Sequence, residues 1–317
     1  MTIGQIKRFN VAGPCQITEH YALPALPRLV GLNGLIGAKR YFVLFAPHQS
    51  GKTTSVKAAA EKLNEDGECH ALYCSLEELT SITDKAQAMK VLLANLNSAL
   101  EIAPSEPLKR NFGESFLAQF NACPDRGDFP VKAWLGTLCS RLDKELVVFF
   151  DEADSLADKV LAHFLSQLRN GYANRDLAPF PRSLALIATR NLQNYQAKIR
   201  PGTGSIGTVT PLNFISEALT IENFTKSQIK RLYDQHAEAT GQIFTEGALQ
   251  RAWHWSEGQP WLVNALARQA VETIDDYQVA ITAGHIDRAA ENLIKGGGDH
   301  IGFLLDRLYE PRVKRFI

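Results

Sequence analysis

One stretch near the N-terminus constrains the fold more than any other. The apolar run 41–45 leads into a short turn, and a helix-compatible segment follows the turn. This strand–loop–helix order is typical of phosphate-binding loops, in which backbone amides curl around a phosphate at the N-terminus of the helix. The pattern G-x-x-x-x-G-K-[ST] ends in Gly51-Lys52-Thr53, with Ala46 in place of its first glycine. Alanine fits that turn if its φ stays negative, so the stretch still predicts phosphate binding.

The loop predicts a distinct role for two side chains. Lys52 would reach the β- and γ-phosphates of a nucleotide, and the hydroxyl of Thr53 would hold Mg²⁺. The alternative is a chance Gly-Lys-Thr beside an ordinary strand, which the flanking pattern does not favour. The residues expected to bind the nucleotide in this loop are Ala46, Pro47, His48, Gln49, Ser50, Gly51, Lys52, Thr53 and Thr54.

A pair of carboxylates is the second landmark. The apolar run 146–150 is typical of a strand buried on both faces, and Asp151 and Glu152 follow it. Ligands of open α/β sheets bind at the carboxyl ends of such strands. We therefore expect Asp151 to join the Mg²⁺ shell and Glu152 to orient or deprotonate an attacking water. The alternative is a solvated acidic pair that caps the next helix.

A further strand is expected at 183–188, and it ends in the polar pair Thr189-Arg190. Either residue stands where a γ-phosphate sensor would lie, at the end of a strand beside the acidic one. For Arg190, a surface arginine in a loop fits the sequence equally well. The glycine-rich segment 202–207 has no strand before it and no helix after it, so we interpret it as a surface loop.

The composition limits which partners and which cellular location we expect for this protein. Lys+Arg and Asp+Glu both number 34 among 317 residues, so the net charge gives no support for nucleic acid as a partner. The five cysteines form no C-x-x-C pair, which favours free thiols in a reducing compartment. No run of eighteen apolar residues and no apolar leader occurs, so we expect a cytoplasmic protein without a membrane partner.

The order of elements predicts an α/β core with a parallel sheet flanked by helices, followed by an all-α helical bundle. Helices are expected at 83–100, 131–142 and 155–169, an extended path at 21–29, and a last strand at 208–212. After 219 the pattern becomes helical, and Thr225 with Gln228 has the spacing of a capping box. The expected organisation is a lead-in at 1–20, a core at 21–215, a helical lid at 216–295 and a tail helix at 296–317.

These pieces together resemble one group of proteins, the bacterial AAA-like ATP-binding proteins related to STAND and archaeal-type ATPases, within the AAA+ branch of P-loop NTPases. The likeness extends from about residue 9 to about residue 315. The matching segments are Phe9–Cys15, His20–Pro24, Ala46–Thr54, Asp151–Leu156, Thr189-Arg190 and Gly258–Asn264.

The resemblance implies ATP and Mg²⁺ as cofactors and two further site residues. Arg190 resembles the sensor arginine that STAND proteins place after their fourth core strand. Pro260 resembles the proline of the G-x-P motif, which lies against the adenine, although proline in the first turn of a helix also explains it. Such ATPases usually carry an output module after the helical bundle, so the expected partner is a second copy of the chain or a separate effector chain.

Three functions compete at this point. The leading one is an ATP-binding and ATP-hydrolysing molecular switch whose nucleotide state controls assembly or partner binding. The second is a DNA-associated remodelling or loading ATPase. Its only C-terminal candidate is the basic cluster Arg307, Arg312, Lys314 and Arg315, which a solvated helix end explains about as well. The third is a nucleotide-stabilised scaffold with negligible turnover. The missing glycine at 46 and the absence of an assignable arginine finger bear on the rate of hydrolysis more than on binding.

Overall fold

The computed structural model describes residues 6–13, 15–103, 108, 129–189, 214–215, 217–274 and 276–295. The chain divides into two compact units. We call them the sheet unit, residues 25–48 and 52–222, and the helical unit, residues 1–24, 49–51 and 223–317. Among the described residues, no helix is both long and apolar enough to cross a membrane.

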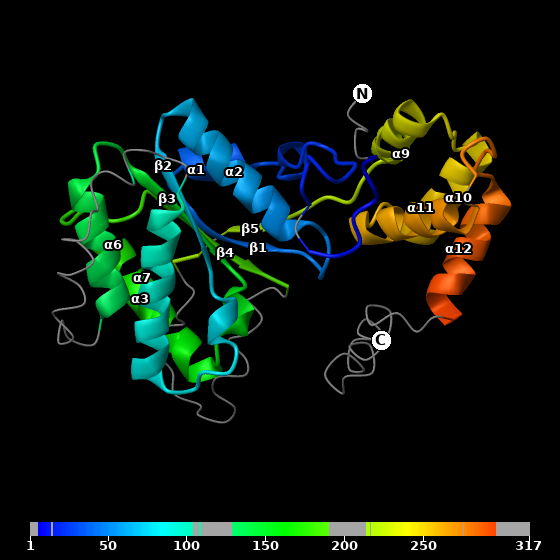
Figure 1. Cartoon of the computed structure of the whole chain (residues 1–317). Coiled ribbons are helices and arrows are strands. Elements are labelled where there is room, and N and C mark those ends of the chain that lie inside the picture. The colour runs from blue at the N-terminus through cyan, green and yellow to red at the C-terminus, as the bar shows by residue number, and fades with distance from the viewer. Residues whose placement is uncertain are drawn as a thin grey trace. The chain divides into compact units, whose positions relative to one another are not determined.

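A parallel sheet of five strands forms the centre of the sheet unit (Figure 1). Its spatial order is β2-β3-β4-β1-β5. Because every pair is parallel, the carboxyl ends of all the strands lie at the same edge of the sheet. This arrangement confirms the predicted fold class. The strands are β1 (Tyr41–Phe45), β2 (His70–Ser75), β3 (Leu146–Asp151), β4 (Ser183–Ala188) and β5 (Glu217–Thr220).

Helices cover both faces of this sheet. One face, with Val148 and Leu186 among its residues, packs against α3 (Lys85–Glu101), α6 (Pro130–Arg141) and α7 (Asp158–Ala173). The other face, with Phe42 and Phe149, packs against α1 (Leu32–Gly37) and α2 (Lys52–Asp66). Since strands β1, β3 and β4 are apolar toward both layers, their residues are almost all buried, as expected for a doubly covered sheet.

Three features of the sheet unit differ from the sequence expectations. Two of them precede β1. The segment expected to be extended contains a 3₁₀ turn, η1 (Leu26–Arg28), because proline fits the first turn of a helix. The helix α1, which the sequence analysis did not predict, follows this turn. The short strand β5 carries the sheet unit to residue 222, seven residues beyond the expected end of the core at 215. Its side chains are mostly exposed, so it lacks the apolar run that marks a buried strand. The expected strand at 208–212 lies outside the described residues.

The remaining expected helices of the sheet unit are present with shifted ends. The helix expected at 155–169 starts later, as α7, because 3₁₀ turn η3 (Ala153–Ser155) comes first. A second 3₁₀ turn, η2 (Glu77–Leu79), follows β2.

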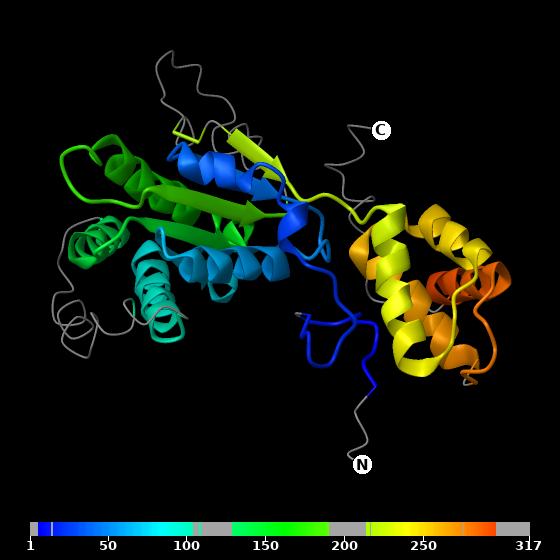
Figure 2. The same cartoon turned by 90° about the horizontal axis from the view of Figure 1, so that it is seen from above.

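The helical unit is a bundle of α9 (Lys226–Thr240), α10 (Glu246–Ser256), α11 (Pro260–Ile274) and α12 (Ala283–Lys295). Figure 2 shows these helices, coloured from yellow to orange-red, gathered together. The predicted capping box is confirmed: Gln228 N donates to Thr225 Oγ1 at 3.2 Å, and Thr225 N donates to Gln228 Oε1 at 2.8 Å. Gly241, at φ 81°, ends the same helix in the left-handed conformation that glycine favours.

The N-terminal segment belongs to the helical unit rather than standing apart as a lead-in. Phe9 and Tyr21 are buried in the core of the bundle, where Phe9 packs edge-on against Tyr233. The side-chain amide of Gln235 pairs with the backbone of Ala22, since Ala22 N donates to Oε1 and Nε2 donates to Ala22 O. The expected start of the core at residue 21 therefore moves to residue 25.

Candidate nucleotide-binding site

The phosphate loop lies where β1 ends and α2 begins. Gln49 and Gly51 have φ angles of 59° and 83°, in the left-handed region, and α2 starts directly afterwards at Lys52. When residues with left-handed backbone angles alternate with right-handed ones, successive backbone N–H groups point toward one place and form an anion-binding concavity. Ala46 has no positive φ, is almost fully buried, and donates its N–H to Ala188 O. Alanine is therefore accommodated at this position without strain.

Lys52 folds over the loop that precedes it. Its Nζ donates to Ala46 O at 2.7 Å and to Pro47 O at 2.8 Å. The side chain is largely buried, and the two carbonyls satisfy part of the hydrogen-bonding capacity of the ammonium group. An ammonium group held at the mouth of an amide-lined loop has the charge and position that a β- or γ-phosphate requires.

Asp151 joins three segments of the sheet unit. Its Oδ2 accepts from Thr53 Oγ1 at 2.7 Å and from Tyr73 Oη at 2.9 Å, and its Oδ1 accepts from Glu152 N at 2.9 Å. The carboxylate is buried, so these hydrogen bonds offset the loss of its hydration. The structure thus brings together Thr53 and Asp151, the two residues that the sequence predicts as Mg²⁺ ligands.

Hydroxyl and carboxylate oxygens are the donors that Mg²⁺ prefers, so this pair fits the ion. Among the described residues, no group of three His, Cys, Asp or Glu side chains could hold a metal by itself. An ion at Thr53 and Asp151 would therefore depend on phosphate oxygens and water for its remaining ligands, as Mg²⁺ usually does in nucleotide sites.

Glu152 follows with a strained backbone and a perturbed side chain. Its φ of 58° lies in the left-handed region, which residues other than glycine seldom adopt. Burial raises the pKa of Glu152 to about 7, and the neighbouring carboxylates of Glu77, Asp151 and Asp154 add to the rise, while Lys52 opposes it. A carboxyl group with a pKa near neutrality is suited to exchanging a proton with water.

The end of β4 is held to the turn after β3. Asp154 Oδ2 accepts from Thr189 N at 3.0 Å and also from Thr189 Oγ1. These contacts place Thr189 at the same edge of the sheet as Asp151, as expected for parallel strands. Arg190, the alternative sensor residue, lies outside the described residues, as do the loop 202–207 and the C-terminal basic cluster.

Pro260 belongs to the helical unit. It is buried as the first residue of α11, and Gly258, at φ 79°, precedes it. A proline at this position has no amide hydrogen to leave unpaired, so the helix start is explained locally. Its role beside an adenine remains a prediction.

Sequence reasoning missed the partners that hold the acidic residues in place. Tyr73 contacts Asp151, and Asp154 contacts Thr189, over 78 and 35 residues of chain respectively. Tyr73 had one visible signal, a hydroxyl on a side chain between the apolar residues Leu72 and Cys74. Asp154 stands in the matching segment Asp151–Leu156, but its spacing gives no indication of its partner.

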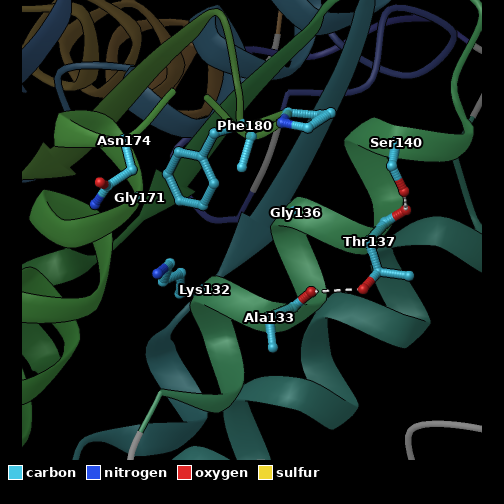
Figure 3. Close-up of a pocket in the computed structure, with 10 residues that line it drawn as sticks. Lys132, Ala133, Gly136, Thr137, Ser140, Gly171, Asn174 and Phe180 are labelled. Atoms are coloured by element: carbon cyan, nitrogen blue, oxygen red, sulfur yellow. Dashed lines mark hydrogen bonds between the residues drawn. The ribbon is translucent and has the colours of Figure 1, made fainter. Parts of the chain in front are cut away.

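A separate cavity of about 300 Å³ lies between α6, α7 and the segment 178–180 (Figure 3). Two hydroxyls on its wall are already used within α6, where Thr137 Oγ1 donates to Ala133 O and Ser140 Oγ donates to Thr137 O. The ring of Phe180 covers Gly171 on the facing helix. None of the predicted site residues lines this cavity, so it is not part of the candidate nucleotide site.

Two solved structures are similar to this chain along most of its length. The Walker-type ATPase Paby2304 of Pyrococcus abyssi has a TM-score of 0.59 at 15% identity, with 96% of this chain and 80% of that chain covered. The ORC1 protein of Aeropyrum pernix, solved in complex with DNA, has a TM-score of 0.51 at 14% identity, with 86% of this chain and 66% of that chain covered.

No protein-family model matches the sequence, and no curated protein matches it. At 14% to 15% identity, the structural likeness concerns the fold alone. The narrower relation to STAND ATPases stays a prediction. With its parallel sheet order and these structural neighbours, the chain has the P-loop NTPase fold of the AAA+ type.

Proposed function

We propose that this protein binds ATP with Mg²⁺, hydrolyses it, and acts as a molecular switch whose nucleotide state controls assembly or partner binding. One observation carries the proposal. The carboxyl edge of the sheet combines an amide-lined loop with Lys52, the oxygen pair of Thr53 and Asp151, and the carboxyl group of Glu152. Phosphoryl transfer requires mainly positioning and neutralisation of charge, and these groups supply both.

Each residue then has a specific task. The loop amides and Lys52 bind the phosphates, and Lys52 offsets negative charge on the β- and γ-oxygens. Thr53 and Asp151 would hold Mg²⁺, which would supply neutralisation of the charge that develops during transfer. Glu152 accepts a hydrogen bond from the attacking water and, when ionised, can take its proton. Asp154 keeps the end of β4 in place through Thr189.

Two assignments rest on the sequence resemblance. Arg190 would contact the γ-phosphate, because it directly follows Thr189 at the end of β4. Pro260 would contact the adenine. ATP is preferred over GTP as the substrate because no N-K-x-D motif, which reads guanine, follows the core strands.

The proposed partners are further copies of this chain or a separate effector chain. A DNA-associated role has no specific support among the described residues, and the balanced charge does not favour it. We also propose a cytoplasmic location, which is consistent with the thiol state of the described cysteines Cys15, Cys69, Cys74 and Cys139.

The proposal is tested by measuring ATP hydrolysis and size-exclusion elution together, with and without nucleotide, for wild type, Lys52→Ala and Glu152→Gln. We expect wild type to hydrolyse ATP and Lys52→Ala to bind it at least about 10-fold more weakly. Glu152→Gln should retain binding, lose turnover by about 10²- to 10⁴-fold, and accumulate in the ATP-bound assembly. If wild type binds ATP without hydrolysing it or changing its elution, the switch is wrong and a nucleotide-stabilised scaffold is the better description.

A further inference from the structure

The hydroxyl of Tyr73 makes a contact that the proposed chemistry does not yet use. Tyr73 lies on β2, and its Oη donates to Asp151 Oδ2 at 2.9 Å. The same oxygen accepts from Thr53 Oγ1 at 2.7 Å. Two donors from different elements, α2 and β2, therefore converge on one carboxylate oxygen at the end of β3.

The strand register explains how the tyrosine reaches this oxygen. Ser75 is paired with Asp151, and Tyr73 is paired with Phe149. Because side chains two residues apart on a strand point to the same face, Tyr73 shares a face with Asp151 and lies diagonally beside it. A short side chain at position 73 would not span this diagonal, whereas a tyrosine hydroxyl does.

The aromatic ring of Tyr73 has a contact of its own, with Lys57 of α2. Lys57 Nζ lies 4.9 Å from the centroid of the Tyr73 ring, close enough for a cation–π contact. Lys57 is one helical turn after Thr53 on α2, so the helix that supplies one donor to Asp151 also holds the ring that supplies the other.

Packing alone does not require a hydroxyl at this position. The ring of Tyr73 packs against the apolar core between the sheet and α2, where phenylalanine would fill the same volume. The hydroxyl instead limits rotation of the Asp151 carboxylate, whose Oδ1 is held at the same time by Glu152 N. Hydrogen-bonding partners that orient a ligand in this way commonly govern the affinity of the site for its metal.

We propose that Tyr73 is a positioning residue that holds the carboxylate of Asp151 in the orientation that binds a divalent cation. This inference rests on the proposed function, because it concerns the Mg²⁺ that would accompany ATP. Tyr73 does not contact the ion or the phosphates. Its hydroxyl acts through Asp151, and its loss leaves the loop, Lys52 and the hydroxyl of Thr53 intact.

The test compares Tyr73→Phe with wild type and with Tyr41→Phe. Tyr41 is a matched control because it is a buried tyrosine of the same sheet. Its hydroxyl donates to Pro181 O at the amino ends of β1 and β4, whereas the candidate site lies at their carboxyl ends. Binding of a fluorescent ATP analogue is titrated in EDTA and then at increasing Mg²⁺ concentrations. Thermal unfolding in EDTA verifies that all three proteins are folded.

We expect Tyr73→Phe to bind the analogue as wild type does in EDTA and to need about 10-fold more Mg²⁺ for half of the Mg²⁺-dependent gain in affinity. Tyr41→Phe should need the same Mg²⁺ concentration as wild type. If Tyr73→Phe matches wild type, binds Mg²⁺ more tightly, or changes only as much as Tyr41→Phe, the inference is wrong and the proposed function is unaffected. If wild type does not bind the analogue at all, both are overturned.

Discussion

Asp154 and Thr189 are joined by two hydrogen bonds that meet at a single carboxylate oxygen. Oδ2 of Asp154 accepts from the amide of Thr189 at 3.0 Å and from its hydroxyl. Asp154 belongs to the turn that follows β3, and Thr189 directly follows β4. This pair of contacts fixes the end of one strand to the acidic turn of its neighbour, so it sets the geometry of the candidate site from outside the phosphate loop.

Removal of the Asp154 carboxylate should therefore destabilise the sheet unit. Asp154→Ala leaves two partly buried donors without their acceptor, which is expected to lower the free energy of unfolding by about 1–3 kcal/mol. Thr189→Val removes only the hydroxyl bond and should have a smaller effect. Urea unfolding measures both, with the exposed Asp176→Ala as a control expected to stay within about 0.5 kcal/mol of wild type.

A double-mutant cycle separates this contact from other effects of the substitutions. If the pair interacts as described, the double variant should be less destabilised than the sum of the two single variants, by about 0.5–3 kcal/mol. Additive effects would contradict the contact.

Gly258 should tolerate alanine far less well than Gly241, although both have left-handed backbones in the helical unit. A Cβ on Gly258 would lie 2.0 Å from the carbonyl oxygen of Phe224, whereas a Cβ on Gly241 meets nothing within 4 Å. Gly241→Ala should cost only backbone strain, about 1–2 kcal/mol, while Gly258→Ala adds a backbone clash and should cost on the order of 4 kcal/mol. Equal losses of thermal stability for the two variants would show that Phe224 does not approach Gly258 in this way.

Stability of the helical unit should fall in mild acid because of His236. Its Nε2 contacts Gln242 Oε1 at 2.9 Å, and its Nδ1 contacts the Tyr21 hydroxyl at 3.2 Å. The amide of Gln242 donates to two backbone carbonyls, so Oε1 is left to accept from Nε2–H, and the neutral ring accepts from Tyr21. A further titratable group close to the ring is Tyr277.

Burial lowers the pKa of His236 below its ordinary value of 6.5, and the hydrogen bond to Gln242 only partly offsets this. The unfolded chain therefore takes up a proton at a higher pH than the folded one. The stabilising contribution is present above the unfolded pKa and is lost as the pH falls through it toward the folded pKa. We expect thermal stability to drop between pH 7.5 and pH 5.5 in wild type and in the exposed variant His254→Gln, and to drop less in His236→Gln. Equal pH dependence in all three would be incompatible with this assignment.

The sequence predicted the features of this fold that are written in continuous local patterns. The apolar runs of β1, β3 and β4 are uninterrupted because both faces of those strands are covered, and the capping box of α9 lies within four residues. By contrast, β5 is mostly exposed and, among the described strands, pairs with β1 alone, so its four residues carry no such pattern.

The candidate site likewise has some residues that the sequence predicted and some contacts that it did not. Lys52, Thr53, Asp151 and Glu152 follow strands that the sequence reveals, and parallel strands bring their ends to one edge. The hydrogen bonds of Tyr73 and Asp154 link residues far apart in the chain, and they depend on the register between strands. The docking of Phe9 into the helical bundle is likewise a tertiary contact that one sequence does not specify.

Direct measurement of ATP binding tests the central claim, that the loop after β1 holds the phosphates of a nucleotide. Isothermal titration calorimetry in Mg²⁺ should compare wild type with Lys52→Ala and with Lys62→Ala, a control lysine on the exposed far end of α2 that pairs with Asp66. The account predicts saturable binding to wild type and Lys62→Ala, and an affinity at least about 10-fold weaker for Lys52→Ala, because a charge-assisted contact to phosphate is lost. Equal binding by Lys52→Ala, or no binding by wild type at millimolar ATP, would contradict it.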